Sequence, residues 1–464
     1  MKKRWVWIGL ASAGFVVGGY LFIPRGLVKA LREPSAVASS REAPAGAPAV
    51  IKKMKPIQDF DGHRVAKDVV AGAENVSPPT FADRVQAIKQ ELTSCGFDGK
   101  ANIFYLRLRD GEMDIDALRE FLKSNAGLYA RMEILLENQG GNVAFSSREA
   151  EREADFVFHR MAKYLLLKSH YDLFSGNSTL AVRDAEKLLA LASALEGSDG
   201  SLYMQSAANR SRAFFQQTAL KVLDRSGGDN RLLQTLHDAL SRHAASVEEP
   251  ARMMDADQRY QKVELLYRWE RFKAEEADGV DPSLLKMFET NVAEEFEAFY
   301  TVLKATAGEP WNNRLEMLQL FKERSENAST ELYFYHKESL SADIANSMPE
   351  TFMTSMALEN FGGMVATLQR KYETVAYQNV LNAVVALKRA KNDGRTITSL
   401  NDLMPDYLSK LPGDPFSGNI LMYDAGSGIV ASIGPKQFGG LSTPRGQLLQ
   451  KIEYREPIFL FSKN

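Results

Sequence analysis

Residues 372–394 read YETVAYQNVLNAVVALKRAKNDG and open the most strongly patterned stretch of the chain, Tyr372 to Gly440. Their apolar residues recur at three- and four-residue steps, which places them on one face of a helix. The members of this stripe are Tyr377, Val380, Leu381, Val384 and Leu387. Asn392-Asp393-Gly394 then ends the helix, because glycine accepts the left-handed backbone of a helix C-cap. The sequence therefore predicts a long helix that ends in a glycine turn.

A short unit punctuated by proline and glycine follows this helix. Ser399 and Asp402 have the spacing of a capping box, which predicts a short helix at this point. Residues 414–418, DPFSG, predict a turn. Two apolar runs, 420–423 and 429–433, flank a Gly-Ser-Gly turn and predict a β-hairpin. Together these signals predict a compact α+β unit over residues 371–464.

Residues 80–370 are dominated by helical periodicity, so the fold class is mostly α. One stripe lies within 182–195 and another within 285–303, where Asp281 is a candidate N-cap and Pro282 falls in the first turn. Short Gly- and Asn-rich breakers separate the stripes, which indicates antiparallel helix pairs in a bundle or an irregular α-solenoid. His159 to Leu195 is weakly similar to a tetratricopeptide helix pair, although no fixed repeat recurs.

The N-terminus predicts a membrane anchor. Basic residues precede an uncharged run from Trp5 to Ile23, which is long enough to cross a bilayer as a helix. We interpret residues 1–24 as an uncleaved anchor with a cytoplasmic stub, since no clear cleavage site follows the run. The distribution of Lys and Arg leans slightly towards an extracytoplasmic body. Residues 25–79 are rich in Pro, Ala and Ser and predict a flexible tether.

Composition limits the possible partners and chemistry. The formal net charge of -2 argues against a protein that wraps nucleic acid, which would require a surplus of Lys and Arg. The single cysteine, Cys95, excludes an intramolecular disulfide and a cysteine-based metal cluster. We expect Cys95 to be a small core residue, and such sparse cysteine suits the bacterial envelope.

The candidate chemical residues lie between positions 151 and 170. His159 and His170 are about three helical turns apart, too far for one metal ion, and no metal-binding motif accompanies them. The acidic cluster of Glu151, Glu153 and Asp155, interleaved with arginines, predicts a solvated helix face with i,i+4 ion pairs. No nucleophile elbow, phosphate loop or dinucleotide fingerprint is present. We therefore predict no catalytic, cofactor-binding or metal-binding residues.

The C-terminal unit resembles the C-terminal domains of type II secretion pseudopilins and type IV pilin-like proteins. The residues that carry the resemblance are Leu387, Lys388, Gly394, Leu400, Leu403, Pro405, Tyr407, Leu408, Leu411-Pro412, Asp414-Pro415-Phe416-Ser417-Gly418, Tyr423 and Ser432-Ile433-Gly434-Pro435. In that family an acidic residue commonly follows the Gly-Pro and loop acids bind calcium, but Lys436 and Gln437 stand there in this chain. No prepilin-peptidase site precedes the apolar run, so a fibre subunit is not expected. The whole layout resembles membrane-anchored bacterial envelope proteins with a helical body.

These observations predict a non-catalytic interaction scaffold in the bacterial inner membrane. The anchor would cross the membrane once and hold the body in the periplasm, where it would bind protein partners as an accessory to a secretion or pilus-type machine. The alternative is an envelope hydrolase with a cleft between the helical body and the C-terminal unit. If the chain is such a hydrolase, we expect several catalytic candidates to converge in a concave, partly buried pocket. These candidates are His159, His170, Glu151 and Asp155.

Overall fold

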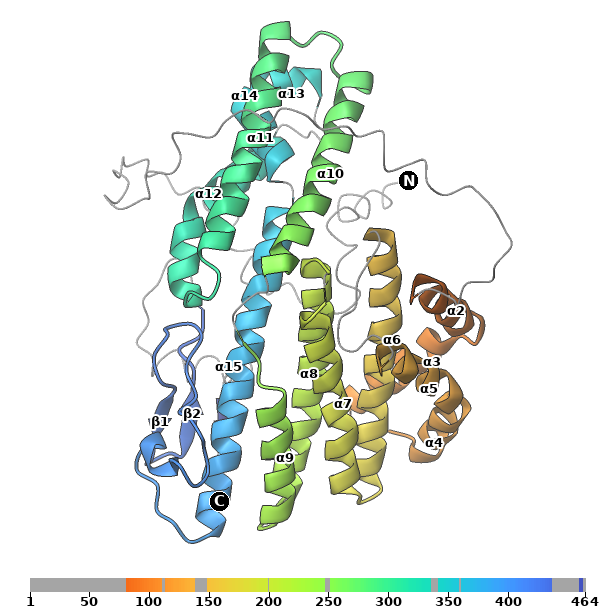
Figure 1. Cartoon of the computed structure of the whole chain (residues 1–464), viewed down its shortest axis with the longest axis vertical. Coiled ribbons are helices and arrows are strands. Elements are labelled where there is room, and N and C mark those ends of the chain that lie inside the picture. Colours follow the sequence, from red (N-terminus) through yellow and green to blue (C-terminus); the bar gives the residue numbers. More distant parts are fainter. Residues whose placement is uncertain are drawn as a thin grey trace, which may run out of the picture. The chain divides into compact units, whose positions relative to one another are not determined.

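The computed structural model describes residues 81–110, 113–137, 148–198, 200–246, 251–334, 341–358, 360–435 and 459–461. The described chain is mostly α, as the periodicity predicts, with fourteen α-helices and little strand (Figure 1). The predicted span, Trp5 to Ile23, lies outside the described residues. Within the described ranges no helix combines the length and apolarity needed to cross a bilayer.

The helices follow one another along the chain with mostly short connections. They are α2 (Phe81–Ser94), α3 (Phe97–Asp110), α4 (Ile115–Ser124), α5 (Ala126–Glu137), α6 (Arg148–Phe174), α7 (Ser178–Glu196), α8 (Leu202–Arg225), α9 (Asn230–Arg242), α10 (Ala251–Glu275), α11 (Pro282–Ala305), α12 (Trp311–Phe334), α13 (Ala342–Ser347), α14 (Pro349–Ala357) and α15 (Phe361–Asn392). A 3-10 helix, η3 (Leu400–Leu403), and three strands, β1 (Met422–Asp424), β2 (Ile429–Ala431) and β3 (Phe459–Phe461), complete the set.

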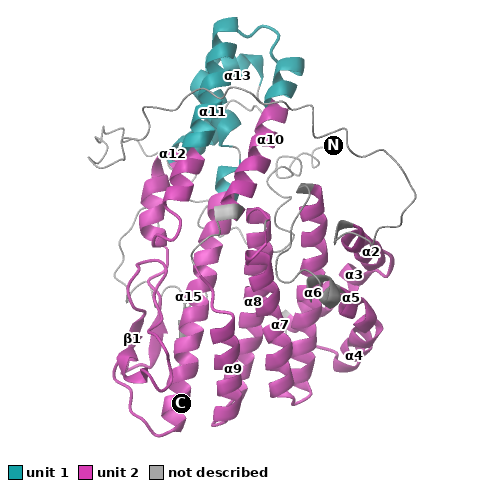
Figure 2. Ribbon diagram, in the orientation of Figure 1, with its two compact units in different colours: residues 1–70, 269–298, 323–363 teal, residues 71–268, 299–322, 364–464 magenta. Residues whose placement is uncertain are grey.

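The chain divides into two compact units, which Figure 2 distinguishes by colour. Unit 2 comprises residues 71–268, 299–322 and 364–464. In it α6, α7 and α8 lie side by side, α2 to α5 pack on or beside α6, and α9 packs on α7. One continuous apolar cluster joins these helices to α15 and to the C-terminal segment.

Polar bonds tie α15 to its neighbours in unit 2. The Gln216 side chain on α8 donates to the carbonyl of Thr374 at 3.3 Å. Lys388 donates through Nζ to the carbonyl of Leu223, near the end of α8, at 2.9 Å. Since carbonyls in the last turn of a helix lack intrahelical partners, Lys388 provides part of the C-terminal cap of α8.

The C-terminal segment contains the elements that its turn residues predict. Ser399 and Asp402 form the predicted capping box at η3, and Gly394, with φ of +75°, follows the end of α15. β1 and β2 pair antiparallel, with Tyr423 opposite Val430. The sequence pattern did not indicate β3, which pairs with β2 from the far end of the chain.

Asp414 organises the DPFSG turn. Its buried carboxylate accepts hydrogen bonds from the amides of Phe416 and Ile433, both at 3.1 Å. The hydroxyl groups of Ser417 and Ser432 donate to the same carboxylate at 3.0 and 2.7 Å. A carboxylate with this many donors joins the turn to the chain that leaves β2, so the motif has a structural role here.

The same turn supports the start of α12. The amides of Trp311 and Asn312 donate to the carbonyls of Pro415 and Phe416 at 3.0 and 3.3 Å. Amides in the first turn of a helix have no intrahelical acceptor, so the turn provides the missing partners. Gly418, at a φ of +76°, lies against Pro310, and a Cβ there would be 2.9 Å from the proline Cγ.

Unit 1, by itself, has described residues within 269–298 and 323–363. Its apolar centre includes a group of aromatic rings, in which Phe352 lies 4.6 Å from Phe272 and 4.8 Å from Phe288 between ring centroids. Arg324 forms an ion pair with the nearly buried Glu295 at 3.1 Å. Burial raises the pKa of Glu295, while Arg324 opposes that rise.

Cys95 is exposed, so the expectation of a core residue was wrong. It lies in the turn between α2 and α3, where Gly96 has a φ of +65°, and Leu92 and Phe97 are the buried residues there. At the predicted boundary after residue 370, α15 continues without a break.

Candidate functional site

Helix α6 carries all four residues that the hydrolase alternative requires, and the acidic ones are not on a solvated face. Glu151 is buried and accepts hydrogen bonds from the amide and hydroxyl of Ser201, at 2.6 and 2.7 Å. Ser201 is the N-cap of α8. Glu153 pairs with Lys89 on α2 at 3.0 Å. The predicted solvated face was therefore wrong, because Glu151 is buried and because Glu151 and Glu153 bond to residues of other segments.

Asp155 and His159 lie one turn apart on α6, and both interact with Arg210 of α8. Arg210 donates to the Asp155 carboxylate. Burial raises the pKa of Asp155, and Arg210 and Arg160 oppose the rise. Burial, followed by repulsion from Lys163, Arg210 and Arg160, lowers the pKa of His159 to about 2. A base of that pKa binds a proton too weakly for general-base work near neutral pH.

His170 lies further along α6 and does not join this group. Its side chain is buried, and neither ring nitrogen has a hydrogen-bond partner. Burial, followed by repulsion from Lys221 and Arg225, lowers its pKa to about 3. Its ring centroid lies 6.5 Å from that of Phe174. The structure thus brings Asp155 and His159 to one arginine and places Glu151 and His170 elsewhere.

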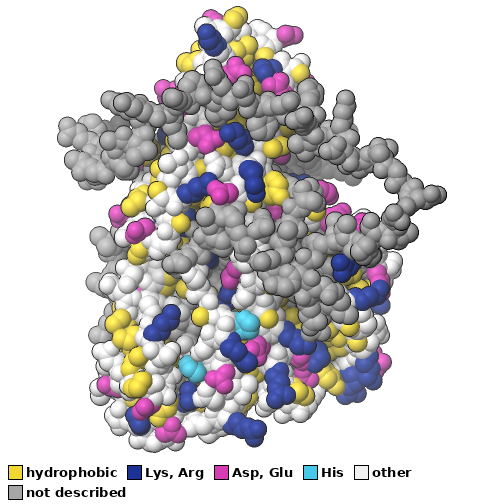
Figure 3. Space-filling view, in the orientation of Figure 1, with side chains coloured by type: hydrophobic (Ala, Val, Ile, Leu, Met, Phe, Trp, Pro, Cys, Tyr) yellow, Lys and Arg dark blue, Asp and Glu magenta, His cyan; other side chains and the backbone are white. Residues whose placement is uncertain are grey.

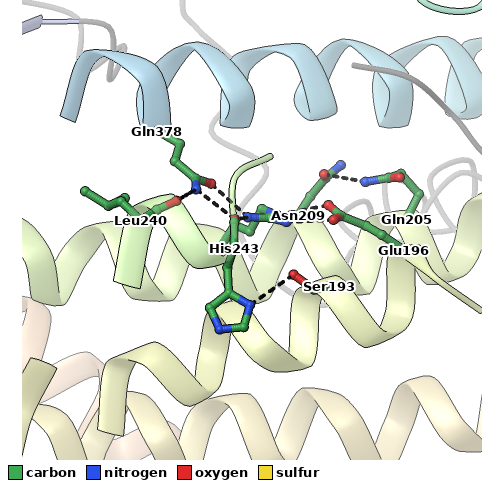
Figure 4. A network of polar contacts seen from close by, with 8 residues as sticks. Ser193, Glu196, Gln205, Asn209, Leu240, His243 and Gln378 are labelled. Carbon is green, nitrogen blue, oxygen red and sulfur yellow. Dashed lines mark hydrogen bonds and ion pairs between the residues drawn. The ribbon is translucent and has the colours of Figure 1, made fainter. Parts of the chain in front are cut away.

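A polar network that joins four helices involves residues that the sequence did not single out (Figure 4). Arg212 of α8 is fully buried and binds the Glu196 carboxylate through Nε and Nη2, at 2.9 and 2.7 Å. Its Nη1 donates to the carbonyl of His243 and to Oε1 of Gln378, both at 2.8 Å. Gln378 of α15 in turn donates to the carbonyls of Leu240 and His243. The network caps the end of α9 and joins it to α7, α8 and α15.

The ring of His243 points towards α7 in the same view. Its Nδ1 lies 3.5 Å from Oγ of Ser193, and its Nε2 lies 3.6 Å from Oε1 of Glu186. This is the residue set of a Ser-His-Glu triad, but both distances exceed the 2.6–3.2 Å or so at which a base accepts a proton. Arg242 also binds Glu186 at 2.9 Å. We therefore interpret these contacts as fixing the end of α9 on α7.

A carboxylate pair lies where α6 meets α7. Lys168 bonds to Asp172 at 3.2 Å and also to Asp184. Burial and the hydrogen bond with Asp184 raise the pKa of Asp172 to about 6, while Lys168 opposes the rise. Across the described residues no group of three His, Cys, Asp or Glu side chains is arranged to hold a metal ion. The lysine occupies the place that a cation would take between the two carboxylates.

Basic and acidic side chains are interspersed over the face of the molecule in Figure 3. Comparison with protein-family models, with curated proteins and with solved structures finds no match to this chain. The functional interpretation therefore depends on the sequence and on the geometry described above.

Proposed function

We propose that this chain is a non-catalytic interaction scaffold, anchored in the bacterial inner membrane with its body in the periplasm. The observation that carries the proposal is the use of ionisable side chains as bonds between helices. The buried Glu151 and Arg212 join segments 50 and 166 positions apart, and the buried Asp414 joins the DPFSG turn to the chain that leaves β2. Polar groups bonded in this way make a body rigid, as a scaffold requires.

Membrane attachment is supported by the sequence alone. The run from Trp5 to Ile23 has the length and composition of a transmembrane helix, and residues 25–79 have the composition of a tether. The basic residues before the run favour a cytoplasmic N-terminus, which would leave the body in the periplasm.

A role beside a secretion or pilus-type machine is supported by the pilin-like motif. The DPFSG turn and the Ser432-Ile433-Gly434-Pro435 run meet at Asp414, whose carboxylate accepts hydrogen bonds from Ser432 and Ile433. Such a unit would serve as a rigid domain for packing on other envelope proteins.

Exposed apolar residues offer contact surfaces for those partners. On α10, Tyr267 and Val263 are 64% and 57% exposed and lie one turn apart. On α12, Leu320 and Met317 are similarly exposed. Large apolar side chains that share an exposed helix face are typical of protein-binding surfaces.

The proposal can be tested by photo-crosslinking in intact cells. Benzoylphenylalanine placed at Tyr267 should give discrete protein adducts, because that side chain is the most exposed of the large apolar ones identified above. The matched control is the same group at Asp224, an exposed polar position on α8. Failure to obtain any adduct from Tyr267, Val263, Leu320 or Met317 would contradict a protein-binding scaffold.

A further inference from the structure

A shallow apolar hollow of about 330 Å³ lies between α3 and α4 in unit 2. Its lining residues are Lys100, Ile103, Phe104, Ala117, Glu120, Phe121, Ser124 and Asn125. Phe104 and Phe121 are buried and in contact, with ring centroids 5.2 Å apart, and so provide an aromatic floor. The hollow is large enough to receive an apolar side chain from another molecule.

The rim of the hollow on α3 carries large apolar side chains in contact with water. Ile103 is 52% exposed, and Leu106, about one turn further along, is 41% exposed. Together with the aromatic floor these residues form an apolar seam along the two helices. Covering such a seam would remove apolar surface from water, which favours association.

The two edges of the seam carry opposite charge. On the α3 edge Lys100 and Arg107 are exposed, and neither side chain has an ion-pair partner within the described part of the chain. On the α4 edge Asp116 and Glu120 are exposed. Within the described ranges their ion pairs are with Arg119 and Lys123 of their own helix, at 2.9 and 3.2 Å. Exposed pairs of this kind are weak, so both carboxylates can take other partners.

We propose that a second copy of this chain docks on this seam through a two-fold contact. Rotation by half a turn lays the basic α3 edge of one copy over the acidic α4 edge of the other, and the two apolar seams face each other. Lys100 then meets Glu120 of the second copy, and the reverse pair forms at the symmetric position. A surface with a positive edge and a negative edge is self-complementary in this way, as a two-fold interface requires.

Charge reversal with rescue tests the proposal on the full chain in detergent micelles, by sedimentation equilibrium. The wild type should dimerise reversibly. Lys100→Glu and Glu120→Lys should each raise the dissociation constant of the dimer at least about tenfold, because each substitution creates two like-charge pairs across the interface. The double variant, Lys100→Glu with Glu120→Lys in one chain, should dimerise nearly as well as the wild type, since the opposite charges meet again.

The controls separate this surface from others. Ile103→Asp should abolish the dimer, whereas Val263→Asp, a change at a comparably exposed position on α10, should leave it unchanged. A monomeric wild type would overturn the proposal. A dimer that neither single charge reversal weakens would also overturn it, and association through the predicted anchor would give that result. A double variant that dimerises no more tightly than the single variants would overturn it as well. None of these results depends on the proposed scaffold function.

Discussion

Acidification tests the burial of His170 on α6. This side chain is buried, neither ring nitrogen has a partner, and two cations, Lys221 and Arg225, lie near enough to disfavour its protonation. The pKa of His170 is lowered from an ordinary 6.5 to about 3. The unfolded chain therefore binds a proton on this histidine at a pH where the folded chain does not.

The sign and size of the effect follow from this difference. A histidine whose pKa is depressed on folding contributes its full stability above the unfolded pKa, and that contribution is lost as the pH falls below about 6.5. A pH of 5 lies about 1.5 units below the pKa of the histidine in the unfolded chain, and this difference lowers the free energy of unfolding by about 2 kcal/mol. His159, with a pKa of about 2, should add a similar amount.

The assay is urea unfolding of the full chain in detergent, followed by far-UV circular dichroism at pH 7 and pH 5. His170→Leu removes the titrating group and a polar side chain without partners, so it should cost little at pH 7. Between pH 7 and pH 5 the variant should lose about 2 kcal/mol less than the wild type. If both proteins lost the same free energy, His170 would not be buried in neutral form, and the reasoning would be refuted.

Three further predictions follow from single contacts. Asp172, with a pKa raised to about 6, destabilises the fold as the pH rises through that value. Between pH 5 and pH 8 the free energy of unfolding of Asp172→Asn should therefore rise by about 1 kcal/mol relative to that of the wild type, measured by the same urea assay. Arg212→Met should lower the free energy of unfolding by about 3–5 kcal/mol, because Glu196 loses its cationic partner in a poorly hydrated site. An unchanged urea midpoint would contradict the network around Arg212. Gly418→Ala should lower the free energy of unfolding by at least about 1 kcal/mol, since the positive φ of Gly418 and the nearby Pro310 both oppose a Cβ. A thermal midpoint equal to that of the wild type would exclude this packing.

Features that depend on neighbouring residues could be predicted from the sequence. The capping box at Ser399 needs only a carboxylate three positions on, and the end of α15 needs only Gly394. Asp281 was correctly expected to cap α11, since its carboxylate accepts from the Ser283 amide at 2.7 Å. In each case the physical cause lies within one turn of chain, so the pattern and its structural result occur together.

Features that depend on distant residues could not be predicted. Arg212 and Gln378 are 166 positions apart, and nothing near either residue indicates the other. Glu151 illustrates the same limit, because its neighbours on α6 suggested a solvated face while its partner, Ser201, is 50 positions away. Buried polar partners are chosen by the packing of helices, which a single sequence without homologues does not reveal.

Membrane topology is the most direct test of the scaffold proposal, which requires the body to lie in the periplasm. Alkaline phosphatase, which is active only after export, and a fluorescent protein that folds only in the cytoplasm can each be fused after Asn464. The account predicts phosphatase activity without fluorescence in the membrane fraction, and loss of membrane association when Trp5 to Ile23 is deleted. A fluorescent, phosphatase-inactive pair of fusions would contradict it.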